Sequence, residues 1–373
     1  MTLRIALFGA ANSIHLQRWA LALMQRGHTV CVLTQHHECA REQLPSAVEL
    51  VELPRCGPAG YFMNARFVRH FLAKWEPDIL HAHYASGYGT TARLVGFRPW
   101  LLSVWGSDVY DFPRKSPMHH WLVKTNLLLA DAVASTSHCM AVEARRIAPG
   151  LRDIAITPFG VDMADFGAAV PVAQAQPGHW VVGTVKTMDH AYGVDMLIRA
   201  FALLLRKLGG SDAVFAKQLR LRLIGGGPQT DDLRELVSVL GVAEKVEFSG
   251  PVPHRDVPQA LAGLDVYVAL SRLESFGVAI IEAGAAARPV VVSDAGGLPE
   301  VVVDGVTGLV VPRENPQAAA DAIERLLRDA DLRRRMGEAA QLHVAQHYSW
   351  PACVATMLGV YERVIAQYRS SET

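Results

Sequence analysis

The sequence predicts an α/β protein made of two Rossmann-like, doubly wound parallel-sheet domains. Apolar segments of strand length alternate with amphipathic segments of helical period along nearly the whole chain. This alternation builds parallel sheets that are covered by helices on both faces. The length of 373 residues suits two domains. Residues 163–178 are rich in Ala, Pro and Gly and lack periodicity, so we interpret them as a linker between domains over 1–162 and 179–348.

The composition restricts the class of function. Lys and Arg together number 36, as do Asp and Glu, so the net charge of zero predicts no nucleic-acid partner. The five Cys residues share no metal-ligand spacing and fit reduced thiols in a cytoplasm. The N-terminus lacks a signal-peptide core, and no apolar run reaches the ~18 residues of a membrane span. We therefore expect a cytoplasmic protein whose contact with the inner face of the plasma membrane, if any, is peripheral.

The chain opens with a Rossmann-like unit of strand, turn, helix and strand. Residues 3–8 predict a strand, 9–13 a turn into a helix, and 28–34 a second strand. The turn lacks a full G-x-G-x-x-G pattern, so dinucleotide binding is only weakly supported here. Ser13 and His15 are candidate cleft residues by position, although Ser13 also suits the N-cap of the following helix.

Residues 62–75 predict an amphipathic helix with aromatic and basic side chains. The aromatic residues are Phe62, Phe67, Phe71 and Trp75, and the basic ones are Arg66, Arg69, His70 and Lys74. This combination is typical of helices that lie on anionic membranes. The alternative is a core-packed helix whose basic face is solvated.

The first domain continues with two more predicted strands, 78–84 and the beginning of 101–110. The second of them ends in a Gly-Ser-Asp turn at 106–108. Doubly wound sheets bind ligands at the carboxyl ends of their strands. Trp105 and Asp108 are therefore candidate cleft residues at this sheet edge.

The second domain begins with a strand over 179–188 that contains Lys186, and an amphipathic helix follows. A strand over 219–228 ends in three glycines, the first of which is Gly225. A tight turn at a strand's carboxyl end allows close approach of a nucleotide, although a simple turn explains the glycines as well. The next strand and loop occupy 245–261.

Residues 265–312 form the most informative segment of the chain. An apolar run at 266–270 predicts a buried strand, and a polar loop follows it. A helical pattern then extends from Phe276 to about Ala287, before a second apolar run at 290–292. Strand, loop, helix and strand make one parallel βαβ unit.

Two carboxylates distinguish this βαβ unit. Glu274 precedes the helix, and Glu282 lies on it among apolar neighbours, where burial without a partner costs on the order of several kcal/mol. Glu282 must therefore either reach water or bind something. The residues that open the helix, 275–277, carry free N–H groups that attract phosphate. The alternative is that Ser275 and Glu274 only cap the helix and that Glu282 is solvated.

The stretch ESFGVAIIE, with SDAGGLPEVVVDGVTGLVVP after it, resembles the Glu-x7-Glu signature and conserved block of retaining glycosyltransferase family 4. This family is also known as glycosyl transferases group 1 and has the GT-B fold. The resemblance implies two Rossmann-like domains facing across a cleft, with a last helix, 349–373, crossing back onto the first domain. It also implies a donor that is a nucleotide diphosphate sugar, linked to UDP or GDP, and no metal or other cofactor.

The resemblance gives roles to individual residues. Those that it places around the nucleotide sugar are Lys186, Gly225, Val252, Glu274, Ser275, Phe276, Gly277, Val278 and Glu282. Glu274 and Lys186 would have catalytic roles; Glu274 would contact hydroxyls of the donor sugar, and Glu282 would bind the ribose. Lys186 and the N–H groups of the helix start would neutralise the diphosphate, and the loop near Val252 would meet the base.

The sequence departs from the family at two positions. Many relatives have a histidine where Trp105 stands, and a second basic residue, commonly a lysine, where Tyr192 stands. The missing positive charge could come from Arg272 or from the other domain. Three histidines, His81, His83 and His138, remain candidate polar groups, although a lone histidine is more often structural.

The expected function is transfer of a sugar, with retention at the anomeric carbon, to a hydroxyl of a glycan or a lipid-linked acceptor. Such reactions build bacterial surface polysaccharide, lipopolysaccharide or lipid-linked glycans. Two alternatives remain open: a non-hydrolysing sugar-nucleotide epimerase, and a sugar-nucleotide binding protein without turnover. Release of nucleotide with and without an acceptor distinguishes the three.

Overall fold

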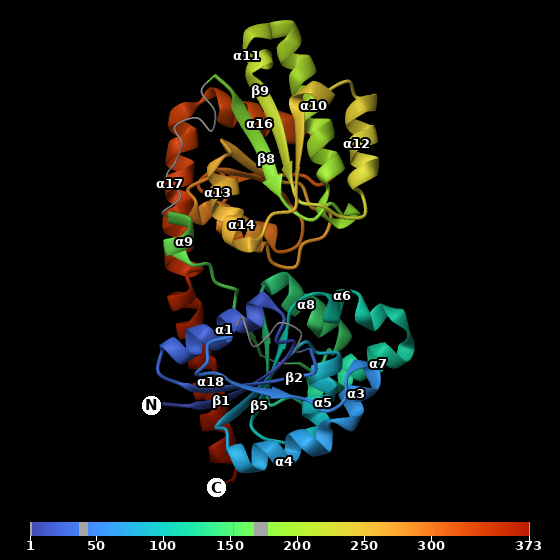
Figure 1. Cartoon of the computed structure of the whole chain (residues 1–373), viewed down its shortest axis with the longest axis vertical. Coiled ribbons are helices and arrows are strands. Elements are labelled where there is room, and N and C mark those ends of the chain that lie inside the picture. The colour runs from blue at the N-terminus through green and yellow to red at the C-terminus, as the bar shows by residue number, and fades with distance from the viewer. Residues whose placement is uncertain (1, 37–43, 152, 168–177, 373) are drawn as a thin grey trace. The chain divides into compact units, whose positions relative to one another are not determined.

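The protein consists of two compact units, each built on a parallel sheet, in the computed structural model of the chain (Figure 1). Unit 1 comprises residues 1–159 and 350–373, and unit 2 comprises 160–349. The predicted pair of parallel-sheet domains is therefore confirmed. The residues that the structure describes are 2–36, 44–151, 153–167 and 178–372.

Unit 1 contains a seven-stranded parallel sheet in the order β3-β2-β1-β4-β5-β6-β7. The chain starts in the middle of the sheet and builds outward in both directions, so β1 lies where the strand order reverses. Ligands of such sheets bind at the carboxyl ends of the strands near this reversal. The strands are β1 (Arg4–Phe8), β2 (Thr29–Thr34), β3 (Glu49–Glu52), β4 (Ile79–His83), β5 (Trp100–Val104), β6 (Ala132–Ser135) and β7 (Ile154–Ile156).

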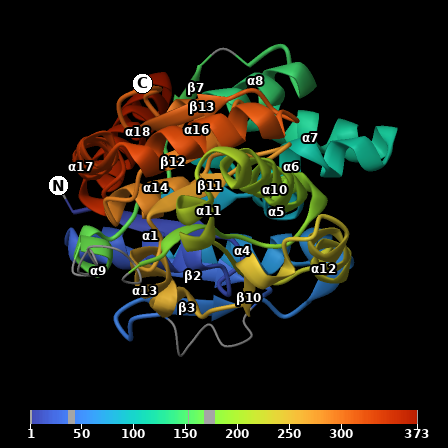
Figure 2. The ribbon, with the colours of Figure 1, turned by 90° about the horizontal axis from the view of Figure 1, so that it is seen from above.

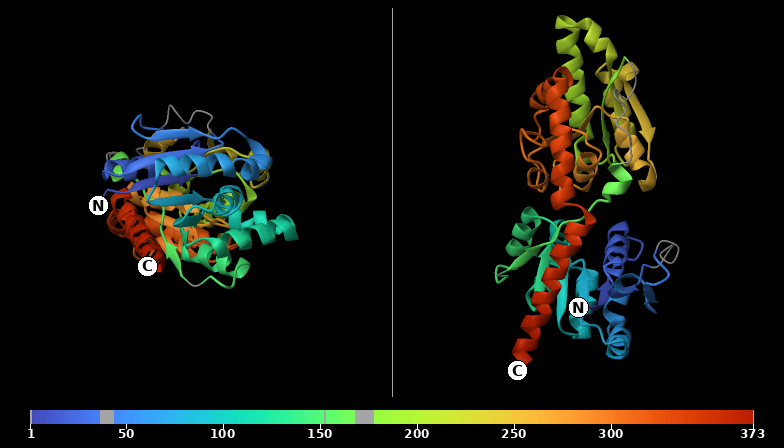
Figure 3. Two further views of the ribbon diagram at one scale, coloured as in Figure 1. Left: turned by 90° about the horizontal axis from the view of Figure 1, so that it is seen from below. Right: turned by 90° about the vertical axis from the view of Figure 1, so that its left-hand side faces the viewer.

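Helices cover the sheet of unit 1. The last helix, α18, packs on α1 through the rings of Trp350 and Trp19, which meet edge to face with centroids 5.2 Å apart. The right-hand view of Figure 3 shows α18 running along this unit. The helices are α1 (Ile14–Gln25), α3 (Gly57–Met63), α4 (Ala65–Trp75), α5 (Gly87–Val95), α6 (Ser107–Tyr110), η1 (Phe112–Lys115), α7 (Pro117–Leu129), α8 (His138–Ile147) and α18 (Trp350–Glu372).

Unit 2 contains a six-stranded parallel sheet in the order β10-β9-β8-β11-β12-β13, and in Figure 2 β10 and β13 mark its two edges. Here β8 is the strand at which the order reverses. The strands are β8 (Trp180–Val185), β9 (Leu219–Ile224), β10 (Val246–Gly250), β11 (Val266–Ala269), β12 (Val290–Ser293) and β13 (Gly308–Val311).

The core of unit 2 forms where α10, α12 and α16 pack on the sheet. Leu197, Ile198 and Phe201 of α10 and Ile323 of α16 are completely or almost completely buried there, as their helical spacing predicts. The helices are α9 (Met163–Gly167), η2 (His190–Tyr192), α10 (Val194–Ser211), α11 (Ala213–Gln218), α12 (Thr230–Val239), η3 (Ala243–Lys245), η4 (His254–Asp256), α13 (Val257–Ala262), α14 (Val278–Ala285), α15 (Leu298–Val301), α16 (Pro316–Arg328) and α17 (Ala330–His347).

Two predicted helices have different bounds in the structure. The segment 62–75 is broken at Asn64, where α3 ends and α4 begins; the buried Asn64 side chain donates to the Arg55 carbonyl at 2.7 Å. The helix expected from Phe276 starts instead at Val278. Gly277, the N-cap of α14, has a φ of 111°, a left-handed conformation that glycine adopts readily. Because this conformation is not helical, the helix begins only after Gly277.

The predicted linker, 163–178, begins with the short helix α9, whose Phe166 is completely buried in unit 2. The remainder of the linker up to 177 lies outside the described residues. In the described part of the chain, none of the helices combines the length and apolar character needed to span a bilayer.

Candidate functional site

The strands of unit 2 bring three candidate segments to one edge of the sheet. Lys186 directly follows β8, the glycine turn at 225–227 directly follows β9, and the loop containing Glu274 follows β11. These three strands are neighbours and parallel, so their carboxyl ends lie together at the reversal of strand order. Open α/β sheets bind ligands at this place.

Lys186 and Glu274 form a buried ion pair. The Lys186 Nζ donates to Glu274 Oε2 at 2.6 Å, and the two side chains are 13% and 10% exposed. Burial alone would lower the pKa of Lys186, but the negative charge of Glu274 and its hydrogen bond outweigh burial and raise the pKa. Lys186 is therefore a permanently charged ammonium at neutral pH. The sequence predicted both residues for the site but not their direct contact.

Two tyrosines complete the surroundings of the Lys186 ammonium. Its Nζ lies 4.4 Å from the centre of the Tyr192 ring, a cation–π arrangement. Tyr192 stands where relatives commonly have a second lysine, and its ring thus faces the ammonium of the remaining lysine, Lys186. Tyr267, which is completely buried on β11, donates its hydroxyl to the Val185 carbonyl at 3.2 Å, and burial raises the pKa of Tyr267.

Glycine backbones hold the ion pair in position. A Cβ on Gly225 would come within 1.9 Å of the Lys186 carbonyl oxygen, and one on Gly296 within 1.9 Å of the Glu274 carbonyl oxygen. Both glycines also have positive φ, 140° and 47°. These close approaches are between protein backbones, so the fold itself requires glycine at both positions. Contact of Gly225 with a nucleotide stays a prediction.

Glu282 projects from α14 into a buried polar contact. Glu282 as a whole residue is 7% exposed, and its Oε1 accepts a hydrogen bond from His254 Nε2 at 2.9 Å. The alternative of a solvated Glu282 is therefore wrong. His254 was not among the residues predicted from the sequence, although it follows Val252 by two residues in the loop expected to meet the base. Val252 itself is half-buried between β10 and η4, and its contact with a base stays a prediction.

The start of α14 carries unused hydrogen-bond donors. Among the described residues, no protein acceptor lies in reach of the backbone N–H groups of Gly277, Val278 and Ala279. Ser275 and Phe276 precede the helix and are not part of its first turn. The unpaired N–H groups that the sequence analysis expected at 275–277 are thus found two residues later, and their binding of phosphate stays a prediction.

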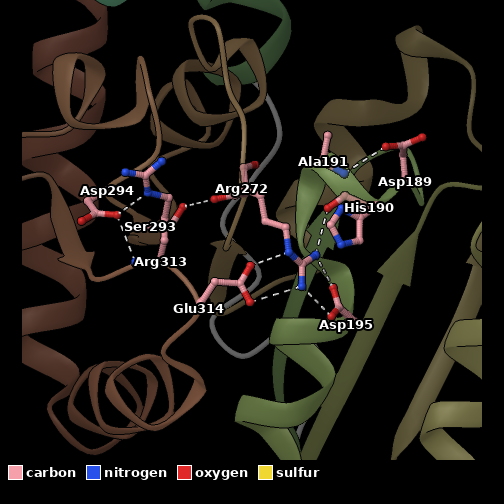
Figure 4. Close-up of polar contacts among 10 residues, drawn as sticks. Asp189, His190, Ala191, Asp195, Arg272, Ser293, Asp294, Arg313 and Glu314 are labelled. Atoms are coloured by element: carbon pink, nitrogen blue, oxygen red, sulfur yellow. Dashed lines mark hydrogen bonds and ion pairs between the residues drawn. The ribbon is translucent and has the colours of Figure 1, made fainter.

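Arg272, one of the two sources considered for the missing positive charge, is held in ion pairs within unit 2. Figure 4 shows its guanidinium between two carboxylates. It donates to both oxygens of Asp195, at 2.7 and 2.8 Å, and pairs with Glu314. It also donates to the His190 carbonyl at 2.9 Å. These contacts occupy the N–H donors of the guanidinium, and the two carboxylates offset its positive charge.

In unit 1, the candidates His15 and Trp105 belong to one aromatic cluster. The His15 ring stacks on Phe159 with centroids 4.0 Å apart, and Trp105 meets both rings edge to face. Ser13 occupies the N-cap position of α1, but its side chain makes no capping hydrogen bond. A ligand contact for these residues stays a prediction.

Asp108 is a buried residue that organises the loops around it. It accepts backbone hydrogen bonds from Ala85, Trp105 and Gly106 at 2.7, 3.1 and 2.8 Å. Burial raises the pKa of its carboxyl group, although the three N–H donors oppose that shift. Asp108 therefore shapes the carboxyl edge of the unit 1 sheet from within.

The two histidines of β4 differ in their surroundings. His81 shares short hydrogen bonds, both 2.7 Å, with Tyr361 of α18 and Ser103, and burial lowers the pKa of His81 to about 3. His83 is completely buried beneath Trp105, with ring centroids 4.5 Å apart. Neither of its ring nitrogens has a hydrogen-bond partner among the described residues. His138 starts α8.

A metal centre is not evident in the described part of the chain, where no three His, Cys, Asp or Glu side chains are grouped to hold an ion. Independence from metals stays a prediction.

Two family models match the chain. The model described as glycosyl transferases group 1 matches residues 170–343, and the model described as glycosyl transferase 4-like matches residues 4–137. The first covers most of unit 2, including the Lys186–Glu274 pair and Glu282, and the second covers most of unit 1.

Curated relatives include two D-inositol 3-phosphate glycosyltransferases. The one from Nocardia farcinica is 35% identical over 317 residues, which is 79% of this chain and 68% of the relative. The one from Streptomyces coelicolor is 36% identical over 325 residues, covering 78% and 70%. The alpha-D-kanosaminyltransferase of Streptomyces kanamyceticus is 35% identical over a shorter stretch of 172 residues, 46% of this chain and 42% of the relative.

Solved structures share the fold over almost the whole chain. Sucrose-phosphate synthase from Thermosynechococcus elongatus has a TM-score of 0.79 at 22% identity, covering 98% of this chain and 100% of that one. HepE of Anabaena, solved in complex with UDP, has a TM-score of 0.77 at 19% identity, with coverage of 97% and 100%.

Proposed function

The chain belongs to glycosyltransferase family 4, the glycosyl transferases group 1, and on that premise we propose the reaction that it performs. It transfers a sugar from a nucleotide diphosphate sugar to a hydroxyl group, with retention of configuration at the anomeric carbon. One observation carries this proposal: neighbouring parts of unit 2 supply the Lys186–Glu274 pair, Glu282 and three N–H groups at the start of α14 that have no acceptor among the described residues.

The diphosphate is assigned to the start of α14. The N–H groups of Gly277, Val278 and Ala279 have no other acceptor in the described chain, and the positive end of the helix favours an anion. Lys186 is the first residue after β8, the strand next to β11 in the sheet, and its ammonium stays protonated at neutral pH. Cationic and N–H donors that are already in place stabilise the charge that develops on a leaving diphosphate by a few kcal/mol each, in order of magnitude.

The two carboxylates are assigned to the two sugar rings. Glu282 accepts from the ribose hydroxyls, because a carboxylate suits a vicinal pair of O–H donors. Glu274 accepts from hydroxyls of the donor sugar while it keeps Lys186 charged. This second function requires Glu274 to share its oxygens between the ammonium and the sugar, which a carboxylate with about four acceptor positions allows.

The transfer itself is a substitution at the anomeric carbon. The bond from this carbon to the diphosphate oxygen breaks, and the bond to the acceptor oxygen forms on the same face of the ring. The proton of the acceptor hydroxyl passes to the departing phosphate, so the products are a glycoside and a nucleoside diphosphate. Lys186 and the α14 amides would hold the leaving group without a metal ion. Undiminished turnover after treatment with a chelator would support this, and loss of turnover that Mg²⁺ restores would refute it.

We assign the nucleobase of the sugar donor as uracil or guanine. HepE, which shares this fold, was solved with UDP and with UDP-glucose, and this favours uracil as the first base to examine. The acceptor would bind at the carboxyl edge of the unit 1 sheet, where His15 and Trp105 lie. We assign it as a hydroxyl of a glycan or of a lipid-linked sugar used for bacterial surface polysaccharide, lipopolysaccharide or lipid-linked glycans.

The test is a panel of UDP- and GDP-sugars incubated with and without glycan acceptors. We expect nucleoside diphosphate to be released only when an acceptor is present, with a retained anomeric configuration in the product by NMR. Formation of an epimeric nucleotide sugar without acceptor would instead identify an epimerase. Tight binding with no turnover on any donor would identify a binding protein.

A peripheral membrane contact of unit 1 is a separate part of the proposal. Phe62 and Met63 at the end of α3 and Phe67 on α4 are exposed apolar side chains next to basic ones. Trp75 does not contribute, because it is buried and donates to Glu49 at 2.8 Å. We expect the protein to sediment with phosphatidylserine vesicles at low salt and less so after Phe67→Ser. Absence of sedimentation at low salt would refute the contact.

A further inference from the structure

His254 is held in one orientation by contacts within unit 2. The short helix η4 begins at His254, directly after the loop that leaves β10. The His254 ring meets the Phe166 ring edge to face, with centroids 6.5 Å apart, and Phe166, a residue of α9, is completely buried. The imidazole is half-buried, with 35% of its side chain exposed. These contacts point its Nε2 at α14.

The hydrogen bond from His254 fixes one oxygen of Glu282 and leaves the other available. Nε2 lies 2.9 Å from Oε1, whereas Oε2 has no donor among the described residues. A glutamate side chain has three rotatable bonds, and a carboxylate that is held at one oxygen loses most of that freedom before a ligand arrives. The same hydrogen bond offsets part of the cost of keeping a carboxylate that is 7% exposed on an apolar helix.

We propose that His254 is a positioning residue for ribose recognition: it holds Glu282 Oε1 so that Oε2 is presented to the hydroxyl pair of a ribonucleotide. This inference rests on the proposed function in assigning the ribose to Glu282. It adds that the preference of the site for ribose over deoxyribose depends on His254, which touches the carboxylate and not the reacting atoms. Hydrogen-bond donors and acceptors in a binding site are most selective when neighbouring side chains fix their orientation before the ligand binds.

A competing interpretation gives the opposite prediction. If the His254–Glu282 contact were a latch that the ribose must displace, then removing His254 would free Glu282 and tighten nucleotide binding. If the contact were only structural, then removing it would lower stability without changing the preference for ribose. The three interpretations therefore differ in affinity and in discrimination, which can be measured separately.

The experiment measures dissociation constants by calorimetry for UDP, GDP and their 2′-deoxy and 3′-deoxy counterparts. We expect the wild-type protein to prefer a ribonucleotide by roughly 10- to 100-fold, as hydrogen bonds to a charged group allow. His254→Ala should weaken ribonucleotide binding about 10-fold and reduce the preference to a few-fold, with little effect on the deoxynucleotides. In a Glu282→Gln background, His254→Ala should have almost no further effect, because the two residues act in series.

Two more variants separate the hydrogen bond from other effects. His254→Gln places an amide N–H near the position of Nε2 and should restore most of the preference for ribose. Arg255→Ala is the matched control, since this next residue of η4 has a side chain that is 85% exposed. It should leave both affinity and preference unchanged.

The possible failures of the experiment have distinct meanings. Wild-type protein that binds none of these nucleotides would overturn the proposed function and this inference together. Wild-type protein that binds ribonucleotides selectively, with His254→Ala retaining that selectivity or binding more tightly, would overturn only the role of His254. A Gln variant as unselective as the Ala variant would overturn the role of the hydrogen bond.

Discussion

Replacement of Lys186 by Met tests the ion pair at the centre of the site. The substitution keeps most of the side-chain volume but leaves Glu274 largely buried without the cation that lies 2.6 Å away. The Ser271 hydroxyl is 3.4 Å from the same carboxylate oxygen, too long to replace that partner fully. Removing one partner of a buried pair costs about 3–5 kcal/mol. Because both side chains retain some exposure, we expect about 3 kcal/mol for Lys186→Met.

The assay is urea unfolding of a small set of variants, followed by circular dichroism. The double variant Lys186→Met/Glu274→Gln has no unpaired charge, so its loss of stability should be about 2 kcal/mol smaller than the sum of the two single losses. Lys207→Met is the control, because its ion pairs with Asp321 and Glu324 lie on the surface of the same unit and such pairs contribute little. A Lys186→Met protein as stable as the Lys207→Met protein would refute the reasoning.

Three further predictions concern the backbone and the pH response. Gly296→Ala should destabilise unit 2 by more than 1 kcal/mol and abolish UDP binding, since its Cβ would meet the Glu274 carbonyl; Gly305→Ala, with positive φ but open space, should cost only about 1 kcal/mol. His81 has a pKa of about 3 when folded and 6.5 when unfolded, so the unfolded chain binds its proton first and stability falls on acidification below pH 6.5, by about 1.4 kcal/mol per pH unit. Urea titrations at pH 7 and 5 should give a smaller difference for His81→Gln; an unchanged difference would contradict the assignment. Asp108→Asn should lower stability by about 2 kcal/mol, because one amide oxygen cannot serve three N–H donors, and should leave UDP affinity unaltered in calorimetry.

The alternation of strands and helices in the sequence was sufficient to predict two parallel-sheet domains. Periodicity is a local property, and it predicted the apolar strands and the buried faces of helices such as α10. It failed at helix ends that depend on single residues. The break at Asn64 coincides with a side-chain hydrogen bond to Arg55, nine residues away, and the late start of α14 coincides with the left-handed backbone of Gly277. Neither feature alters the hydrophobic pattern.

The identity of the site residues was predictable, but most of their partners were not. The sequence predicted Lys186, Glu274 and Glu282 from a motif. It gave no sign that Lys186 reaches Glu274 across 88 residues, or that His254 supports Glu282 across 28. The sequence likewise gave no sign that Arg272, a basic residue near the site, pairs with two carboxylates, Asp195 and Glu314. Such contacts depend on strand order and loop shape, which the composition of a segment does not reveal.

A crystal structure with UDP or GDP bound tests the central claim most directly, which is that unit 2 holds a nucleoside diphosphate at the start of α14. We predict diphosphate oxygens at about 2.7–3.2 Å from the backbone nitrogens of Gly277, Val278 and Ala279. We also predict that the ammonium of Lys186 lies beside them and that the ribose hydroxyls contact Glu282. A diphosphate bound at the glycine turn 225–227 or elsewhere, with the start of α14 left to solvent, would contradict it.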